Sequence, residues 1–179
     1  MLNTLILFAA LAFTPQDGSL LFIEGGNRIV QNNTDSTLSH VAIILKEDKT
    51  FWVYEAVKPK VRKIKLDDYY VEIKQLNSRK KKNQRKVWIA NPNTPLTKNQ
   101  KTSIKNYLEK QLGRKYSVAS YLSESPTDSI HCCELVGEAL SDLEYTKNPC
   151  ADAPIDVWKK TLKFYKERKL INIQSNPLK

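Results

Sequence analysis

Cysteine and histidine are the residues of this chain best suited to nucleophilic chemistry, and it holds only three cysteines and two histidines. Cys132 stands where a polar segment gives way to an apolar-periodic one, which predicts that it lies in the first turn of a helix. Unpaired N–H groups and the positive end of the helix dipole stabilise a thiolate there. The same N–H groups would hold the oxyanion that forms when a carbonyl is attacked. Cys132 is therefore the predicted nucleophile, and a small buried core residue is the alternative interpretation.

The neighbours of Cys132 compete for the chemical roles. Cys133 would point about 100° away from Cys132 around the helix, and it is the rival nucleophile. His131 is the rival base, although a residue at a helix entry usually points away from the thiol beside it. For Cys150 and Cys133 the sequence leaves two alternatives. They form a disulfide if the protein is exported to an oxidising space, or both are free thiols. The chain has no C-x-x-C motif and too few histidines for a structural zinc site, so no metal and no cofactor is expected.

A predicted β-hairpin supplies the preferred base. If Glu47 and Asp48 form a two-residue turn, paired positions sum to 95, and His40 lies directly opposite Glu55. Their Cβ atoms would then be about 4.5–5.5 Å apart. A carboxylate at that distance fixes the imidazole tautomer and raises its basicity. The alternative is an edge carboxylate and a strand histidine without a catalytic role.

Strand-like segments come first in the chain and helix-like segments later. The strands are expected at residues 19–24, 40–45 and 50–57, with a further pair at 61–66 and 87–90, and residues 31–37 are expected to form a loop. The helices are expected from the capping box Thr97-x-x-Gln100 to Gly113, over residues 132–143, and from about Asp152 through Trp158. This order predicts an α+β fold in which an antiparallel sheet packs against helices.

The length of the chain and its N-terminal segment indicate how the domains are organised. A chain of 179 residues with 41% apolar residues fits one compact domain with a real core, which excludes wholesale disorder. Residues 1–14 resemble a signal peptide, with an apolar run that ends near Ala10-Leu11-Ala12 but lacks a basic residue before it. The prediction is a secreted or periplasmic protein whose single domain spans residues 15–179. The alternative is a buried N-terminal element in a cytoplasmic protein.

The formal net charge of +10 predicts anionic rather than cationic partners. Residues 79–86 hold six of the 29 basic residues. This loop is either a solvated segment or a contact for an anionic substrate or membrane surface. No aromatic residue interleaves the basic ones, so no nucleic-acid partner is expected. The oligomeric state is not indicated.

Short motifs, taken in order, resemble the permuted papain-like amidases typified by YiiX, within the NlpC-type superfamily of cysteine peptidases. The similar segments are Gly18–Phe22 (GSLLF), Ser39–Ile43 (SHVAI), Tyr54–Ala56 (YEA) and Cys132–Val136 (CCELV). The resemblance extends from about Gly18 to Trp158. It departs from the family pattern at Ser19 and Ser117, which replace Asp, and at Cys133, which replaces Ser.

The resemblance implies a papain-like fold, circularly permuted so that the nucleophile follows the base, and a Cys–His–Glu triad. Cys132 would be the nucleophile, His40 the general base and Glu55 the group that orients it. Tyr116 would line the pocket and, with Cys133, is a candidate for substrate or oxyanion contacts. The implied activity is amide hydrolysis through a thioester, on cell-wall peptides or other peptides. The alternatives are a lipid-directed thioesterase or acyltransferase of the same fold, and a binding module without catalysis.

Overall fold

A computed structural model describes residues 13–26, 28–80, 82–118, 121, 128–141 and 151–173. Nearly all of the predicted signal peptide lies outside the described residues, and so does Cys150. No helix within the described ranges is long and apolar enough to cross a membrane.

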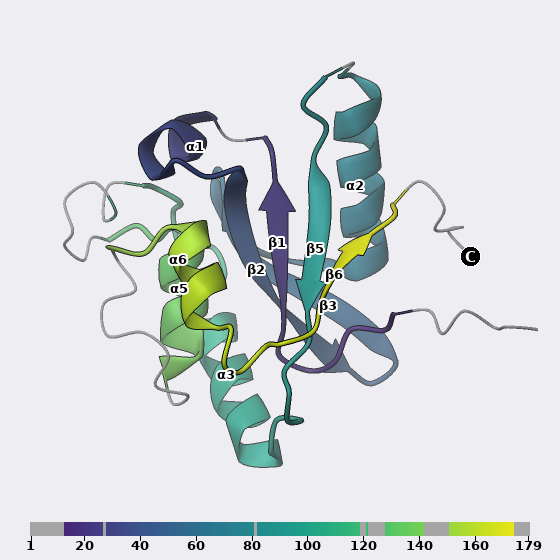
Figure 1. The fold of residues 1–179 in the computed structure, drawn as a ribbon. Helices are drawn as coiled ribbons and strands as arrows, with labels where there is room; N and C mark the ends of the chain where they lie inside the picture. Colours follow the sequence, from purple (N-terminus) through teal and green to yellow (C-terminus); the bar gives the residue numbers. More distant parts are fainter. Residues whose placement is uncertain are drawn as a thin grey trace, which may run out of the picture.

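A six-stranded antiparallel sheet forms the centre of the fold, with strand order β4-β3-β2-β1-β5-β6 (Figure 1). The strands are β1 (Ser19–Glu24), β2 (Leu38–Glu47), β3 (Thr50–Val57), β4 (Lys60–Lys65), β5 (Lys86–Ala90) and β6 (Arg168–Ile171). The helices are α1 (Arg28–Thr34), α2 (Leu66–Ser78), α3 (Lys98–Gln111), α5 (Cys132–Ala139) and α6 (Pro154–Lys160). The predicted α+β class and the antiparallel sheet are confirmed.

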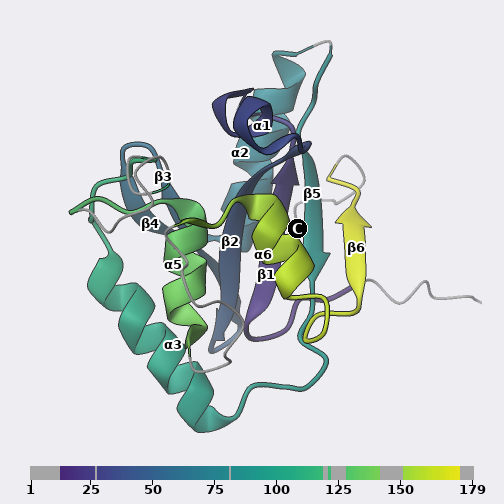
Figure 2. The same cartoon turned by 60° about the vertical axis from the view of Figure 1, so that its left-hand side comes forward.

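Helices cover both faces of the sheet, so that its central strands are apolar on both sides. In β1, Leu20 and Phe22 join one buried cluster while Leu21 and Ile23 join the other, as the alternation of a strand requires. Helices α3, α5 and α6 lie on the first face and α2 lies on the second (Figures 1 and 2). This three-layer arrangement places the start of α5 and one side of α2 at the same end of β2.

The structure corrects several predicted elements in the first half of the chain. The expected loop at 31–37 begins as the last part of α1. Helix α2 was not predicted, and its first residue, Leu66, had been assigned to a strand. The segments at 61–66 and 87–90 do not pair with each other, because β4 pairs with β3 while β5 pairs with β1 and β6. Short local patterns do not specify which distant strands pair.

The predicted hairpin register is wrong by two residues. Glu47 pairs with Thr50, so the turn is Asp48-Lys49 and paired positions sum to 97. Asp48 adopts φ 53°, a left-handed conformation that Asp tolerates better than most residues. A shift of two residues preserves the face on which each side chain lies. His40 and Glu55 therefore still share a face, although they are diagonal rather than directly opposite.

The helical predictions for the second half are largely confirmed. Thr97 and Gln100 form the expected capping box at the start of α3, and Gly113 follows the helix with φ +85°. Helix α5 begins at Cys132 as predicted but ends at Ala139, four residues before the expected end. Helix α6 begins at Pro154, as expected from its first-turn proline.

Candidate active site

His40 and Glu55 form a direct contact on the α2 face of the sheet. The Nε2 atom of His40 lies 2.7 Å from Oε2 of Glu55. Their side chains are only 15% and 2% exposed, so water competes weakly for this hydrogen bond. The β2–β3 ladder ends at the Ile43–Tyr54 pair, and the two side chains meet just beyond that pair. A carboxylate on Nε2 leaves Nδ1 of the imidazole for a second partner.

Arg62 and Glu72 extend the pair into a charged chain. Arg62 is directly opposite Glu55 in the β3–β4 ladder, and its Nε donates to Oε1 of Glu55 over 2.7 Å. Its Nη1 and Nη2 donate to the two carboxylate oxygens of Glu72 on α2, over 3.1 and 2.7 Å. Burial alone would raise the pKa of Glu55, but the hydrogen bond from His40 and the charge of Arg62 lower it. Glu55 is therefore an ionised carboxylate with a fixed orientation.

Cys132 is the other group that raises the pKa of the His40 imidazole. Burial alone would lower the pKa of His40, but hydrogen bonds to Cys132 and Glu55 outweigh it and raise the pKa to about 10. Cys132 packs in the cluster on the α5 side of the sheet, whereas Glu55 and Arg62 lie on the α2 side. The imidazole thus connects the two sides of the sheet at the point where β2 and β3 are no longer paired.

Cys132 is the first residue of α5 and is buried. Its Sγ lies 3.8 Å from Sγ of Cys133, and the hydrogen bond between the thiols is the largest cause that lowers the pKa of Cys132. Burial opposes this shift, while His131 and His40 reinforce it. Burial and the neighbouring sulfur raise the pKa of Cys133. Of the two free thiols, Cys132 is the one that ionises more readily.

His131 has a structural position at the start of α5. It is the N-cap residue, and its Nδ1 accepts the backbone N–H of Cys133 over 3.2 Å. The sequence had suggested that the N–H groups of this first turn hold an oxyanion. The N–H of Cys133 is instead bonded to His131. Its ring also makes an edge contact with Tyr121, at 6.0 Å between centroids. The rival base is therefore near Cys132, but one of its nitrogens is already engaged by the helix.

Tyr116 lies near the thiols and on the wall of a cavity. It pairs with Ile130, two residues before Cys132, and its backbone N–H donates to the carbonyl of Pro59. Burial raises its pKa well above the usual range, and the charges of Cys132 and Cys133 raise it further. The cavity of about 890 Å³ is also lined by His40 and Glu55, and its size suits a ligand site.

The structure brings together five of the residues that the sequence singled out, Cys132, His40, Glu55, Tyr116 and Cys133, with His131 beside them, while Cys150 lies outside the described residues. It adds two residues that were missed, Arg62 and Glu72. A signal for Arg62 was present, because pairing Val57 with Lys60 across a two-residue turn places Arg62 opposite Glu55. Glu72 depends on α2, which was not predicted, so no sequence signal led to it.

Comparison with known proteins assigns the chain to a family. A family model described as "Permuted papain-like amidase enzyme, YaeF/YiiX, C92 family" matches residues 14–149, most of the chain. The chain belongs to this family. The crystal structure of YiiX from Escherichia coli O157:H7, a protein described as a metalloprotein, is similar in fold with a TM-score of 0.60 and 18% sequence identity. The match covers 89% of this chain and 98% of that chain. No curated protein matches the chain.

Membership of the C92 family explains the order of the site residues along the chain. Strand β2, which carries His40, comes before helix α5, which carries Cys132, and this is the order that the resemblance to permuted papain-like proteins implies. The matched region contains both of these residues, together with Glu55, Arg62 and Tyr116. The resemblance noted from the sequence is confirmed at the level of family and fold.

Proposed function

We propose that this protein is a cysteine amidase that cleaves peptide-type amides through a thioester, with Cys132, His40 and Glu55 as its triad. The single observation that supports this most is the position of His40, whose Nε2 bonds to Glu55 over 2.7 Å and whose pKa is raised by both Cys132 and Glu55. Membership of an amidase family supports the reaction class. Within the described residues, the arrangement joins a low-pKa thiol to an oriented imidazole.

The proposed reaction begins with the thiolate of Cys132 and the imidazolium of His40. Sγ attacks the amide carbonyl carbon, and the carbonyl oxygen becomes an oxyanion held by the Cys132 N–H and the Tyr116 hydroxyl. As the C–N bond breaks, His40 gives its proton to the leaving amine and becomes neutral. Water then attacks the thioester while His40 takes its proton, the C–S bond breaks, and a carboxylic acid and the original ion pair result.

The sulfurs of Cys132 and Cys133 and a ring nitrogen of His131 lie within 4.8 Å of one another. These donors fit a thiophilic ion such as Zn²⁺, and three protein ligands is the number found in catalytic zinc sites. When bound, such an ion would polarise a carbonyl as a Lewis acid. It would also occupy the sulfur that we assign as the nucleophile, so we propose that it competes with the thiol reaction.

Selective alkylation tests the assignment of the nucleophile. Iodoacetamide at pH 7 should label Cys132 at least about tenfold faster than Cys133 or Cys150, because Cys132 is the one of the two described cysteines whose thiol pKa is lowered. Peptide mapping by mass spectrometry measures the three rates, and added Zn²⁺ should slow the labelling of Cys132. Equal, slow labelling of all three cysteines would indicate a binding module without catalysis. Product analysis with peptide amides and with acyl lipids separates amidase from lipid-directed activity.

The raised pKa of His40 predicts an unusual alkaline limb in the pH profile. His40 must carry a proton to release the amine, so kcat/KM should stay level above neutrality and fall as the pH rises through about 10. Steady-state kinetics with one peptide amide between pH 6 and about 11 measures the limb. Glu55→Gln removes the negative charge that helps to raise this pKa, so its limb should move toward neutrality by about one unit or more. A wild-type limb near the usual histidine pKa would contradict the proposed ion pair.

A further inference from the structure

Basic side chains outnumber acidic ones on the wall of the cavity beside His40. Lys58, Lys80 and Arg85 line it, as does Arg62. The two carboxylates on this wall, those of Glu55 and Glu72, are both bonded to Arg62. Within the described residues, the other three cations therefore have no carboxylate partner on the wall. The site is built to hold a negative charge that the described part of the protein does not itself supply.

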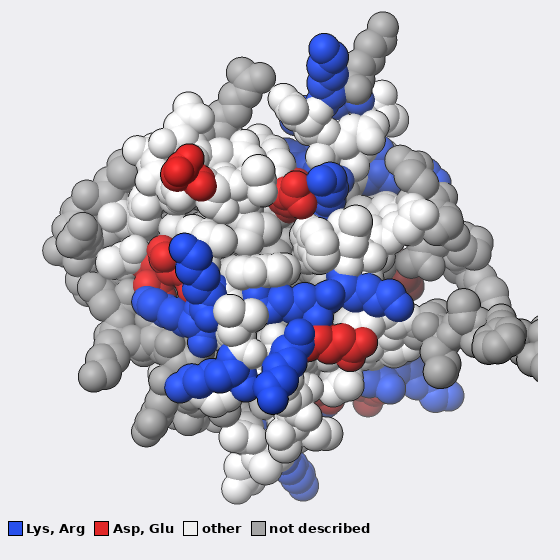
Figure 3. Space-filling model, in the orientation of Figure 1, with Lys and Arg blue, Asp and Glu red and all other residues white. Residues whose placement is uncertain are grey.

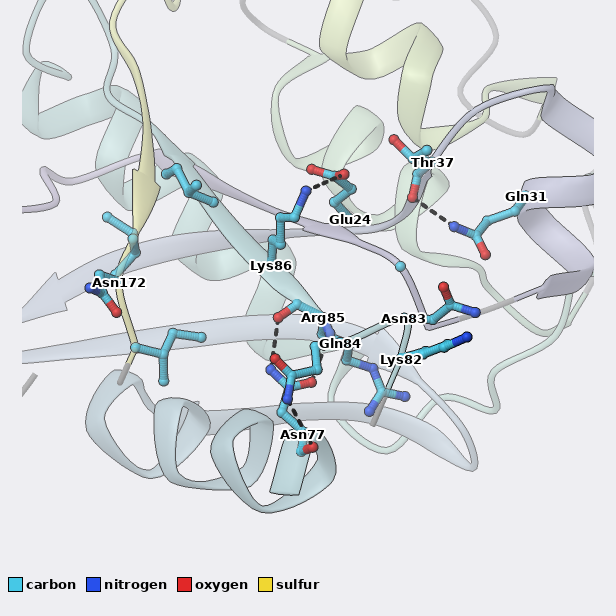
Figure 4. Close-up of a pocket in the computed structure, with 14 residues that line it drawn as sticks. Glu24, Gln31, Thr37, Asn77, Lys82, Asn83, Gln84, Arg85, Lys86 and Asn172 are labelled. Carbon is cyan, nitrogen blue, oxygen red and sulfur yellow. Dashed lines mark hydrogen bonds and ion pairs between the residues drawn. The ribbon is translucent and has the colours of Figure 1, made fainter. Parts of the chain in front are cut away.

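Arg85 is the best positioned of these cations. Its backbone N–H donates to Oδ1 of Asn77 over 2.7 Å, and Nδ2 of Asn77 donates back to its carbonyl over 2.8 Å. Asn77 is buried at the end of α2. The two hydrogen bonds therefore fix the backbone of Arg85 just before β5 begins. Figure 4 shows Asn77 bonded to Arg85, with Lys82 and Asn83 beside it.

A glycine leaves the space that the Arg85 side chain occupies. Gly26 has φ +105°, and a Cβ atom built there would stand 2.6 Å from Nε of Arg85. The Arg85 side chain therefore lies directly against the backbone at Gly26, whose positive φ favours glycine. Gly26 and Arg85 both line the cavity that holds His40, and Arg85 also lines an adjoining cavity of about 760 Å³.

The guanidinium of Arg85 is held in place but not paired. Its Nη1 is buried and has no hydrogen-bond partner, which is a costly state for a charged group. Arg168 also has one unpaired Nη1, but it bonds through its Nε and Nη2 atoms. No such bond is present for the Arg85 guanidinium among the described residues. Figure 3 shows Lys and Arg side chains near the tip formed by the end of α2 and the start of β5, so the local charge is strongly positive.

We propose that Arg85 is a specificity residue that binds a carboxylate of the substrate, so that the preferred substrates are peptide amides that carry a free carboxylate beside the scissile bond. This inference rests on the proposed amidase function. A guanidinium binds a carboxylate through two parallel hydrogen bonds, and Arg85 lines the cavity of His40 without a carboxylate partner on its wall. Arg62 cannot bind the substrate carboxylate in this way, because its guanidinium is already bonded to Glu55 and Glu72.

Two peptide amides that differ only at one terminus test the proposal. One ends in a free carboxylate and the other in a carboxamide. Wild-type kcat/KM should favour the carboxylate by about tenfold or more, and Arg85→Gln should remove that preference mainly through KM. Arg85→Lys should keep part of it, because it keeps the charge but not the paired geometry. Arg79→Gln removes the same charge from the same loop, but the side chain is exposed and lines none of the described cavities, so the preference should change by less than about twofold.

A binding measurement separates this proposal from the proposed function. The same two peptides are titrated calorimetrically into the Cys132→Ala protein, with and without Arg85→Gln. Tighter binding of the carboxylate form that Arg85→Gln abolishes supports the site even if no hydrolysis is found. Equal binding of both peptides, or an equal effect of Arg79→Gln and Arg85→Gln, overturns it even if the protein is an active amidase.

Discussion

Replacing Cys132 by alanine should abolish amide hydrolysis, with a loss of more than about 10⁴-fold in kcat/KM. The variant keeps the helix start and His40 but has no atom that can form the thioester. The buried volume lost is one sulfur, so the far-ultraviolet circular dichroism spectrum and the cooperative thermal transition should be retained. Single-turnover mass spectrometry provides a second measurement, because a covalent acyl adduct should appear on the wild type and not on the variant.

Cys133→Ala is the matched control for this prediction, since it removes the same atom one residue away. The hydrogen bond between Cys133 and Cys132 contributes most to the low pKa of Cys132, so its loss should raise that pKa. We expect kcat/KM at pH 7 to fall by less than about tenfold and to recover at higher pH. An inactive Cys133→Ala protein beside a fully active Cys132→Ala protein would reassign the nucleophile to Cys133.

The proximity of His40 and Glu55 could be predicted from the sequence even though the hairpin register could not. The predicted turn was one residue out of place, which shifts the pairing register by two, and an even shift leaves both residues on the same face because side chains alternate with a period of two along a strand. An error of one residue would have separated them. The prediction of a shared face was therefore more robust than the prediction of a directly opposite pair, which is wrong.

The missed parts of the site depend on packing between distant segments. Leu66, Tyr69, Tyr70 and Ile73 have helical spacing and are buried in α2, so the periodicity to find this helix was present. That Glu72 of α2 reaches Arg62 of β4 follows only from how the helix packs across the sheet. The N-cap role of His131 was also hidden, since capping residues are usually Ser, Thr, Asp or Asn.

The second large effect is expected for His40→Ala, which should lower kcat/KM by about 10³–10⁴-fold. The imidazole has two functions in the proposed reaction, because it stabilises the Cys132 thiolate and delivers a proton to the leaving amine. Both depend on the contacts that its ring makes with Cys132 and Glu55. Steady-state kinetics measures the loss, and iodoacetamide labelling measures the first function alone, since Cys132 should react more slowly at pH 7 once its partner is removed.

His131→Asn is the control that distinguishes a base from a helix cap. Asparagine is among the best N-cap residues, so this variant should keep the bond to the Cys133 N–H while removing the only other imidazole of the chain. Because the proton pathway runs through His40 and Glu55, we expect His131→Asn to lose less than about tenfold in kcat/KM. Comparable losses in both variants would mean that proton transfer is shared between the two rings. An inactive His131→Asn protein with an active His40→Ala protein would move the base to the helix start, and the paired carboxylate of Glu55 would then have no catalytic partner.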